Sequence, residues 1–330
     1  MTDTIRFTLD GQEVEAQSGE TIWTVAKRCG TTIPHLCHKD APGDRSYGNC
    51  RAFMVAIEGV RTLAASCVRV PAEGMVVTTN EPREVQARRM VVEMLMADQP
   101  AQDIAHDRSS HFWDMAEATG VSESRFPALE EPRIPLLDDS HVAMSVNLDA
   151  CIQCNLCVRA CREVQVNDVI GMAGRGHESY PVFDMADPMG ASTCVACGEC
   201  VQACPTGALL PATVTEGAGP GDSKDYDSEV DSVCPFCGVG CQVSLKVKDG
   251  KVKYVEGISG PANEGRLCVK GRFGFDYIHH PHRLTVPLIR RHDAPAKGLN
   301  VDPGDWSTHF REATWDEALG FAANGLKGRG

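Results

Sequence analysis

Two short runs of cysteine limit the structures open to this chain more than any other feature of its sequence. Both runs have the spacing C-x2-C-x2-C-x3-C, and the second is followed by proline. The runs are Cys151, Cys154, Cys157, Cys161 and Cys194, Cys197, Cys200, Cys204. This spacing is typical of loops that wrap a 4Fe–4S cube. Its recurrence predicts a duplicated half-domain.

The pairing of the two runs follows from bacterial two-cluster ferredoxins, in which the fourth cysteine of each run ligates the cluster of the other run. We therefore expect two crossed sets, called site A and site B. Site A contains Cys151, Cys154, Cys157 and Cys204, and site B contains Cys194, Cys197, Cys200 and Cys161. Zinc is the alternative, but zinc usually takes two C-x2-C pairs separated by a longer spacer. The crossed pairing would make the two clusters close neighbours, able to exchange electrons.

A third group, called site C, follows further along the chain. It contains Cys234, Cys237, Cys241 and Cys268. Gly238 and Gly240 lie between the first three cysteines and allow the backbone to approach a bulky core. The spacing predicts a four-thiolate site, for a 4Fe–4S cluster or for zinc.

Composition limits the setting in which these cysteines work. Sixteen cysteines suit metal or cluster binding better than disulfides if the chain stays in a reducing compartment. The start MTDTIRFTLDG lacks a signal-peptide pattern, and no apolar run is long enough to span a membrane. We therefore expect a cytoplasmic protein without a membrane partner. A net charge of −13 also argues against nucleic acid as a partner.

The pattern along the chain predicts an α+β multidomain protein. Alternating residues 4–16 around Asp10-Gly11 predict a hairpin, and a helix is expected from Thr21 to Cys29, with Cys29 buried as a structural residue. Pro82 should open a helix that runs to about Ala97, with Val85, Val92 and Leu95 near helical spacing and Arg88 and Arg89 on another side. A second hairpin is expected around Asp249-Gly250, and a helix start at Thr314-Trp315-Asp316-Glu317. The expected domains are a 2Fe–2S ferredoxin-type domain (1–80), a helical connector (81–140), a two-cluster ferredoxin domain (141–212), an exposed linker (213–231), a β-rich 4Fe–4S domain (232–290) and the start of a further domain (291–330).

The segment around site C resembles the opening of a molybdopterin oxidoreductase of the formate dehydrogenase type. The matching residues read CPFCGVGC, then GRLCVKGRFGFDYIHHPHRLTVPLIR, then ATWDEAL. The resemblance implies a 4Fe–4S cluster at site C beside a bis-molybdopterin guanine dinucleotide that carries molybdenum or tungsten. It also implies that Lys270 lies between this cluster and a pterin; otherwise Lys270 is an ordinary surface lysine. His279, His280 and His282 lack a metal-site spacing, and we expect a structural or pterin-proximal loop there.

The first domain resembles the plant-type 2Fe–2S domain, of β-grasp fold, at the start of complex I large subunits, iron hydrogenases and NAD-linked formate dehydrogenases. The resemblance rests on IPHLCHKDAPGDRSYGNCRAFMVAIEGVRTLAASC and places the ligands at Cys37, Cys50, position 53 and Cys67. Position 53 is Phe53, which cannot bind iron. His38, Asp44 or Cys29 could replace it, the cluster could be labile, or the domain could be a scaffold without a cluster. The additional His/Cys cluster of complex I relatives has no counterpart in residues 98–120.

Taken together, the chain resembles the N-terminal part of the alpha subunit of a cytoplasmic, NAD-linked formate dehydrogenase. The resemblance implies three 4Fe–4S clusters and one 2Fe–2S cluster that relay electrons from formate oxidation to a flavin- and NAD-binding iron–sulfur subunit. The catalytic molybdenum site would lie in the rest of the molybdopterin domain, outside this chain. The alternative is a relay subunit of a hydrogenase or a complex I-like NADH oxidoreductase, although such a relay would not need the pterin-domain opening after residue 232.

Overall fold

The structure is a computed structural model that describes residues 4–41, 44–128, 137–215, 219–298 and 302–328. Its contacts divide the chain into two compact units, Met1–Gly274 and Phe275–Gly330. All of the cysteines fall in the first unit. Among the residues described, no helix is long and apolar enough to cross a membrane.

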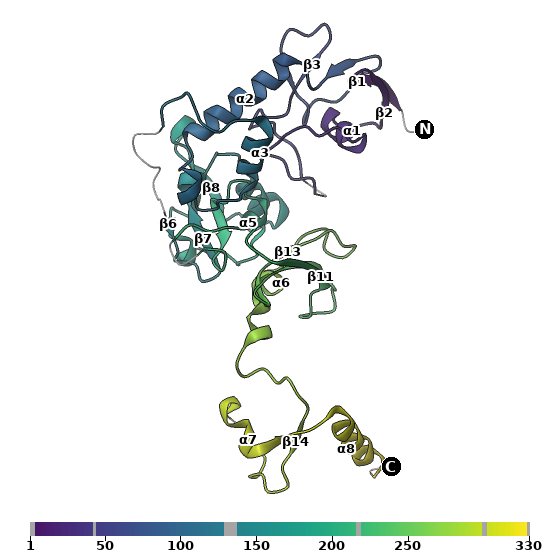
Figure 1. The fold of residues 1–330 in the computed structure, drawn as a ribbon, viewed down its shortest axis with the longest axis vertical. Helices are drawn as coiled ribbons and strands as arrows, with labels where there is room; N and C mark the ends of the chain where they lie inside the picture. Colours follow the sequence, from purple (N-terminus) through teal and green to yellow (C-terminus); the bar gives the residue numbers. More distant parts are fainter. Residues whose placement is uncertain (1–3, 42–43, 129–136, 216–218, 299–301, 329–330) are drawn as a thin grey trace. The chain divides into compact units, whose positions relative to one another are not determined.

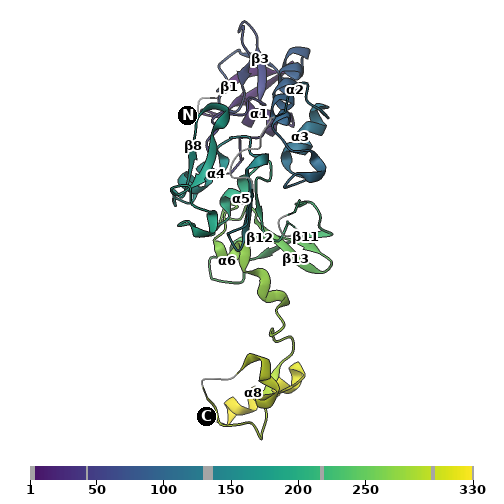
Figure 2. The ribbon, with the colours of Figure 1, turned by 90° about the vertical axis from the view of Figure 1, so that its left-hand side faces the viewer.

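The N-terminal part of the first unit is a five-stranded mixed sheet with one helix (Figures 1 and 2). The strand order is β2-β1-β5-β3-β4, in which β1 and β5 are parallel and the other pairs are antiparallel. The elements are β1 (Ile5–Leu9), β2 (Gln12–Ala16), α1 (Ile22–Arg28), β3 (Met54–Ile57), β4 (Ala64–Ala65) and β5 (Val76–Thr78). The predicted hairpin is confirmed, because Leu9 pairs with Gln12 across a turn in which Asp10 and Gly11 both have positive φ.

The predicted helix after the hairpin is also confirmed, but the prediction for Cys29 was wrong. The Thr21 side chain caps α1 by accepting from the Thr24 N–H at 3.2 Å. Cys29 is the C-cap residue and is exposed rather than buried. The apolar side of α1 ends one turn earlier, with Val25 and Ala26, and these residues pack into the core of the sheet.

Helix α2 (Pro82–Ala97) has the predicted bounds, and it packs against α3 (His111–Thr119) after the short η1 (Gln102–Ile104). Its orientation differs from the sequence expectation, since Val85 is 38% exposed and Arg88 is only 5% exposed. The Arg88 guanidinium donates to the Met54 carbonyl at 3.4 Å and to Asn80 Oδ1 at 3.3 Å. These acceptors compensate the burial of its charge, which hydrophobic spacing could not reveal.

The duplicated cysteine runs lie on short helices between small sheets. Strand β7 pairs with β6 and β10, and β8 pairs with β9, all antiparallel. The elements are β6 (Leu137–Asp138), β7 (Met144–Asn147), η2 (Leu148–Ala150), α4 (Leu156–Arg159), η3 (Ala160–Val164), β8 (Ile170–Ala173), η4 (Gly176–Glu178), β9 (Tyr180–Phe183), η5 (Met189–Ala191), α5 (Glu199–Ala203) and β10 (Leu209–Pro211). Helices α4 and α5 pack against each other, so the two runs share one core.

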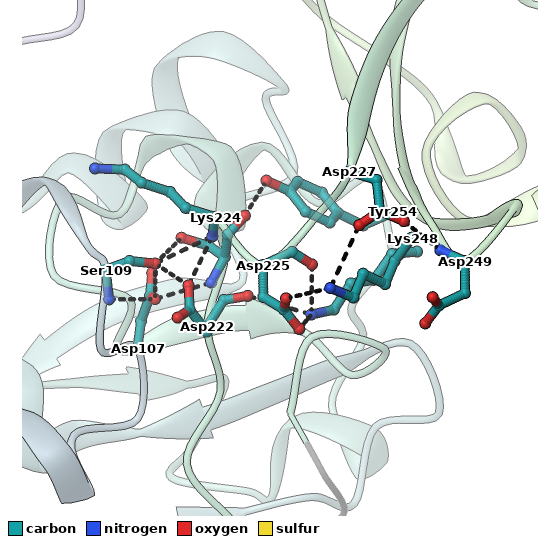
Figure 3. Close-up of polar contacts among 11 residues, drawn as sticks. Asp107, Ser109, Asp222, Lys224, Asp225, Asp227, Lys248, Asp249 and Tyr254 are labelled. Carbon is teal, nitrogen blue, oxygen red and sulfur yellow. Dashed lines mark hydrogen bonds and ion pairs between the residues drawn. The ribbon is translucent and has the colours of Figure 1, made fainter.

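The stretch predicted as an exposed linker is exposed along its final strand, and hydrogen bonds hold the residues before that strand to the rest of the fold. Its end forms β11 (Ser228–Val233), which pairs with β12 (Gln242–Lys248). Figure 3 shows how the preceding residues are held: Asp107 Oδ1 accepts from the N–H groups of Ser109 and Ser223, both at 3.1 Å. Tyr254 donates to the Ser223 carbonyl at 2.7 Å. The Asp and Ser residues that suggested a solvated loop instead satisfy backbone N–H groups.

Strand β13 (Lys251–Gly257) completes a three-stranded sheet and confirms the second predicted hairpin around Asp249-Gly250. Helix α6 (Val269–Phe273) follows Cys268 and packs against β13. In the second unit, η6 (Gly274–His279) is followed by β14 (Leu288–Arg290), η7 (Pro303–Asp305), α7 (Trp306–His309), β15 (Phe310–Glu312) and α8 (Trp315–Lys327). Thr314 caps α8 as its sequence predicts, by accepting from the Glu317 N–H.

Candidate iron–sulfur sites

The structure brings the cysteines of site A together across the two runs. Besides burial, negative charge on Cys204, from the second run, raises the pKa of the Cys154 and Cys157 thiols in the first run. Site B shows the reverse crossing, because Cys161 from the first run acts on Cys194 and Cys200 in the second. Thiols of one run therefore lie close enough to act on thiols of the other run, and the crossed ligand sets stay a prediction.

The thiols of these sites are poorly suited to carry charge without a cationic partner. Burial is the largest cause that raises the pKa of Cys154, Cys157 and Cys200, and neighbouring thiolates raise it further because like charges repel. A positively charged metal core reverses this balance and keeps its thiol ligands deprotonated. The donor set therefore fits iron–sulfur cores, which accept four thiolates each.

Both runs bend in the same way at matching positions. Gln153 and Ala196 have φ of 56° and 55°, and Asn155 and Gly198 have φ of 66° and 71°. Left-handed backbone is unfavourable for residues with a side chain, so its repetition indicates a shared constraint on the loop.

The same bends direct backbone N–H groups at sulfur. Gln153 donates to Cys151 Sγ at 3.4 Å, and Ala196 donates to Cys194 Sγ at 3.3 Å. Val169 donates to Cys161 Sγ at 3.3 Å. Hydrogen bonds to sulfur are one of the means by which proteins set cluster potentials.

Sites A and B are neighbours, and the first domain adjoins site A. Burial and the other site A thiolates raise the pKa of the Cys157 thiol most. Cys200 of site B lies close enough for its charge to raise this pKa further. In the first domain, Asn49 Nδ2 donates to the Cys154 carbonyl at 3.4 Å, and the charge of Cys50 acts on Cys154.

The cysteines of site C also lie close together, beside the β11–β13 sheet: Cys234 directly follows β11, and Cys241 directly precedes β12. Burial and then the charges of Cys234, Cys237 and Cys268 raise the pKa of the Cys241 thiol. The Cys234 N–H donates to the Cys241 carbonyl at 2.8 Å, which closes the loop. Cys234 is buried, whereas Cys237 and Cys268 are exposed, so this site is open to solvent on one side.

The structure also places Lys270 and two of the histidines that the sequence analysis named. Lys270 lies on α6, two residues after Cys268, with its side chain exposed. The rings of His280 and His282 pack edge to face at 5.1 Å in the second unit.

Zinc was the alternative to a cluster at these cysteines. A tetrahedral zinc site needs three or four ligands around one point, with Zn–S distances of about 2.3 Å. Within the part of the chain that the structure describes, no group of three His, Cys, Asp or Glu side chains is arranged to hold a single metal ion.

The first domain assembles Cys37, Cys50 and Cys67, called site N. The Cys50 N–H donates to Cys37 Sγ at 3.2 Å. The hydrogen bond from the Cys37 thiol lowers the pKa of Cys50 to about 6, whereas burial, with the charge of Cys50, raises the pKa of Cys67 to about 11.

The fourth position of site N does not fit a cluster. Phe53 is fully buried, and its ring stacks on His35 at 5.3 Å and meets Trp23 edge-on at 6.0 Å. The position has become part of the hydrophobic core of the sheet. Site N therefore has three thiol ligands and an apolar wall.

The residues considered as substitutes for the fourth ligand have other contacts. His38 Nδ1 lies 2.8 Å from Ser46 Oγ, and the Asp44 carboxylate lies 3.6 Å from Arg159 Nη2. Cys29 is exposed at the end of α1. A substitute ligand stays one of the three alternatives that the sequence left open.

Sequence reasoning missed two charged residues beside site B. Glu199 lies between Cys197 and Cys200, Arg272 lies on α6, and their side chains form an ion pair of 2.5 Å with 0% and 2% exposure. A signal was present, because an acidic residue inside a cluster-binding loop needs a cation nearby.

Three models of known protein families match parts of the chain. Residues 2–82 match the 2Fe-2S iron-sulfur cluster binding domain, residues 150–208 the 4Fe-4S dicluster domain, and residues 227–280 the molybdopterin oxidoreductase Fe4S4 domain.

Similar proteins include a subunit of an NADH-quinone oxidoreductase of Rhizobium meliloti, which is 35% identical over 98% of this chain and 37% of its own length. A putative formate dehydrogenase of Staphylococcus haemolyticus is 26% identical over 97% of this chain and 34% of its own length. Among solved structures, an NAD+-reducing [NiFe]-hydrogenase in the H2-reduced state has a TM-score of 0.56 and 28% identity, covering 65% of this chain and 88% of that chain.

This chain thus spans little more than a third of the curated relatives that it matches. It carries a 2Fe–2S-type domain, a 4Fe–4S dicluster domain and a molybdopterin-oxidoreductase Fe4S4 domain in that order. The chain therefore contains the iron–sulfur domains described by these three family models and is similar, over nearly its whole length, to part of a subunit of an NADH-quinone oxidoreductase.

Proposed function

We propose that this chain relays electrons between a molybdopterin site in the remainder of its subunit and a flavin- and NAD-binding partner subunit in the cytoplasm. The overall reaction proposed is formate + NAD+ to CO2 + NADH. The relay is supported by the interaction between the thiols of sites A and B and by the hydrogen bond from the Leu267 N–H, next to Cys268 of site C, to Glu199, next to Cys200 of site B. When bound, 4Fe–4S cores at these sites would each accept and donate one electron at a time.

The proposed ligands follow the groups found in the structure. Site A would use Cys151, Cys154, Cys157 and Cys204, site B would use Cys161, Cys194, Cys197 and Cys200, and site C would use Cys234, Cys237, Cys241 and Cys268. Site C would lie nearest to the molybdopterin, and site A would lead toward the first domain. The contact between Asn49 and the Cys154 carbonyl supports the last step of this order.

Site N has a separate place in the proposal. Cys37, Cys50 and Cys67 would hold a 2Fe–2S cluster only with a fourth ligand, and Phe53 blocks the expected position. No electron is routed through site N for this reason. The first domain would serve as a docking module beside site A.

Lys270 is proposed to contact a pterin of the bis-molybdopterin guanine dinucleotide. Its ammonium is exposed beside Cys268, on the open side of site C. A lysine in this position could donate hydrogen bonds to an electron-rich pterin ring. Either molybdenum or tungsten would suit this proposal.

Formate is supported by the resemblance of the site C segment and by the putative formate dehydrogenase among the relatives. A second candidate is a relay in an NADH-oxidising complex without a molybdopterin substrate site, which the similarity to the NADH-quinone oxidoreductase of Rhizobium meliloti favours. The two candidates differ in the compound that delivers the electrons.

The test is reduction of the clusters in the anaerobically purified complex, followed by electron paramagnetic resonance. Under the first proposal, formate alone produces reduced 4Fe–4S signals, and the complex contains molybdopterin guanine dinucleotide. Reduction by NADH but not by formate, without any pterin, would support the second candidate and remove the first.

A further inference from the structure

The ion pair between Arg272 and Glu199 is unusual because both side chains are almost completely buried. The Nη2–Oε1 distance is 2.5 Å, and the side chains are 2% and 0% exposed. Removing two charges from water is expensive unless the geometry and the remaining hydrogen bonds compensate. A pair of apolar side chains could fill this position with less difficulty, so the charges themselves require an explanation.

Arg272 is bound entirely by the loop and helix of site B. Its Nε donates to the Cys197 carbonyl at 2.7 Å, and its Nη1 donates to Gln202 Oε1 at 2.6 Å. With the Glu199 carboxylate, these partners engage every nitrogen of the guanidinium. The rigid fork of arginine fits such a set, and a lysine could not reproduce it.

Glu199 extends the same contact to the other iron–sulfur segments. Its Oε1 also accepts from the Leu267 N–H at 3.1 Å, one residue before the site C ligand Cys268. Its Oε2 accepts from Lys39 Nζ at 3.3 Å, two residues after Cys37 of site N. One carboxylate therefore joins sites B, C and N.

The backbone is shaped to admit Arg272. Gly198 has φ of 71°, and a Cβ on this residue would lie 2.1 Å from Arg272 Cδ and 2.8 Å from Phe273 Cζ. Gln202 holds the end of β13 as well, since its amide exchanges hydrogen bonds with the Gly257 backbone at 2.9 and 3.1 Å. The segment that carries Cys268 is thus fixed on site B at several points.

We propose that Arg272 is a positioning residue that fixes site C against site B and, paired with Glu199, sets the reduction potential of the site B cluster. This inference rests on the proposed relay and names the residues that control its middle step. A buried cation favours the more negative, reduced form of a neighbouring cluster, and a buried anion opposes it. Arg272 should raise the site B potential, whereas Glu199 should lower it.

Two substitutions in the full chain test the proposal through opposite signs. Arg272→Gln should leave the iron content unchanged and lower the reduction potential of the site B cluster by about 59 mV. For one electron, this shift corresponds to about a tenfold change in the equilibrium of electron exchange with the neighbouring clusters. Glu199→Gln preserves the shape of the side chain and should shift the potential upward. Both should weaken the magnetic coupling between the reduced site B and site C clusters.

Arg272→Lys and Arg162→Gln complete the series. Arg272→Lys retains the charge but loses the fork, so the potential should recover while the coupling stays weak. Arg162 pairs with Asp168 at 2.5 Å beside the site B ligand Cys161, but it is 56% exposed. Solvent screens such a charge, and Arg162→Gln should change neither measurement.

The potential and the coupling are measured by redox titration with electron paramagnetic resonance. Unchanged values in Arg272→Gln, or shifts of the same sign in Arg272→Gln and Glu199→Gln, would overturn the proposal. Absence of clusters from the wild-type chain would instead contradict the relay itself, so the two failures are distinguishable.

Discussion

Replacing Phe53 with cysteine should change the stability of the first domain in opposite directions without and with iron. The phenyl ring fills the core between His35 and Trp23 and is fully buried. In the absence of iron the variant should lose stability because a cavity replaces the ring. In the presence of iron and sulfide the new thiol completes a set of four with Cys37, Cys50 and Cys67.

The size of the loss follows from the burial of the ring. Removing a buried phenyl group down to alanine costs about 3–5 kcal/mol. The cysteine sulfur recovers about 0.8 kcal/mol if it is equated with one buried methylene. The iron-free variant should therefore be less stable than wild type by about 2–4 kcal/mol. If the components of the cluster are present at an effective concentration of about a thousand times its dissociation constant, binding adds about 4 kcal/mol to the free energy of unfolding of the variant.

The assay combines denaturant unfolding with metal analysis of the full chain reconstituted anaerobically. Phe53→Cys should gain about two iron atoms per chain, with a 2Fe–2S resonance signal. Phe53→Ala is the matched control and should lose stability without gaining iron. A cysteine variant that gains no iron over the alanine variant would refute the assignment of Cys37, Cys50 and Cys67 to one site.

Three other substitutions test separate parts of the account. Cys161→Ser should remove the site B signal and retain that of site A, and loss of site A alone would contradict the crossed grouping. Gly198→Ala should destabilise the chain by about 2–5 kcal/mol in chemical unfolding, from left-handed strain and the clash with Arg272, and a change below about 0.5 kcal/mol would contradict the packing. Burial lowers the pKa of His106, which bonds the Gly207 carbonyl at 2.8 Å and Ser145 Oγ at 3.0 Å. Below about pH 6.5 the unfolded state takes up the proton first, so stability should fall as the pH drops from 7.5 to 5.5. His106→Gln should flatten this dependence in thermal unfolding, and an equally steep curve in the variant would exclude His106 as its source.

Local sequence signals predicted the elements that depend on local physics. The Asp10-Gly11 and Asp249-Gly250 turns, the cap at Thr314 and the start of α2 at Pro82 all follow from backbone preferences of a few residues. The crossed assignment of the cysteines came from the pattern of two-cluster ferredoxins and stays a prediction.

Features that depend on distant partners were not predicted. Arg88 was expected on the outer side of its helix, but the Met54 carbonyl and Asn80 make its burial favourable. The polar stretch after residue 218 was expected to be a linker without fixed partners. Within it, the Ser223 N–H donates to Asp107, and the Ser223 carbonyl accepts from Tyr254. The Glu199–Arg272 pair joins residues 73 positions apart, and no local pattern links them.

Iron and acid-labile sulfide analysis of the anaerobically purified full chain, with quantitative electron paramagnetic resonance after reduction, tests the central claim most directly. Three cubes require about twelve iron atoms per chain and three interacting 4Fe–4S spins. Zinc in their place, or thiols that stay free of iron after reconstitution, would contradict the account.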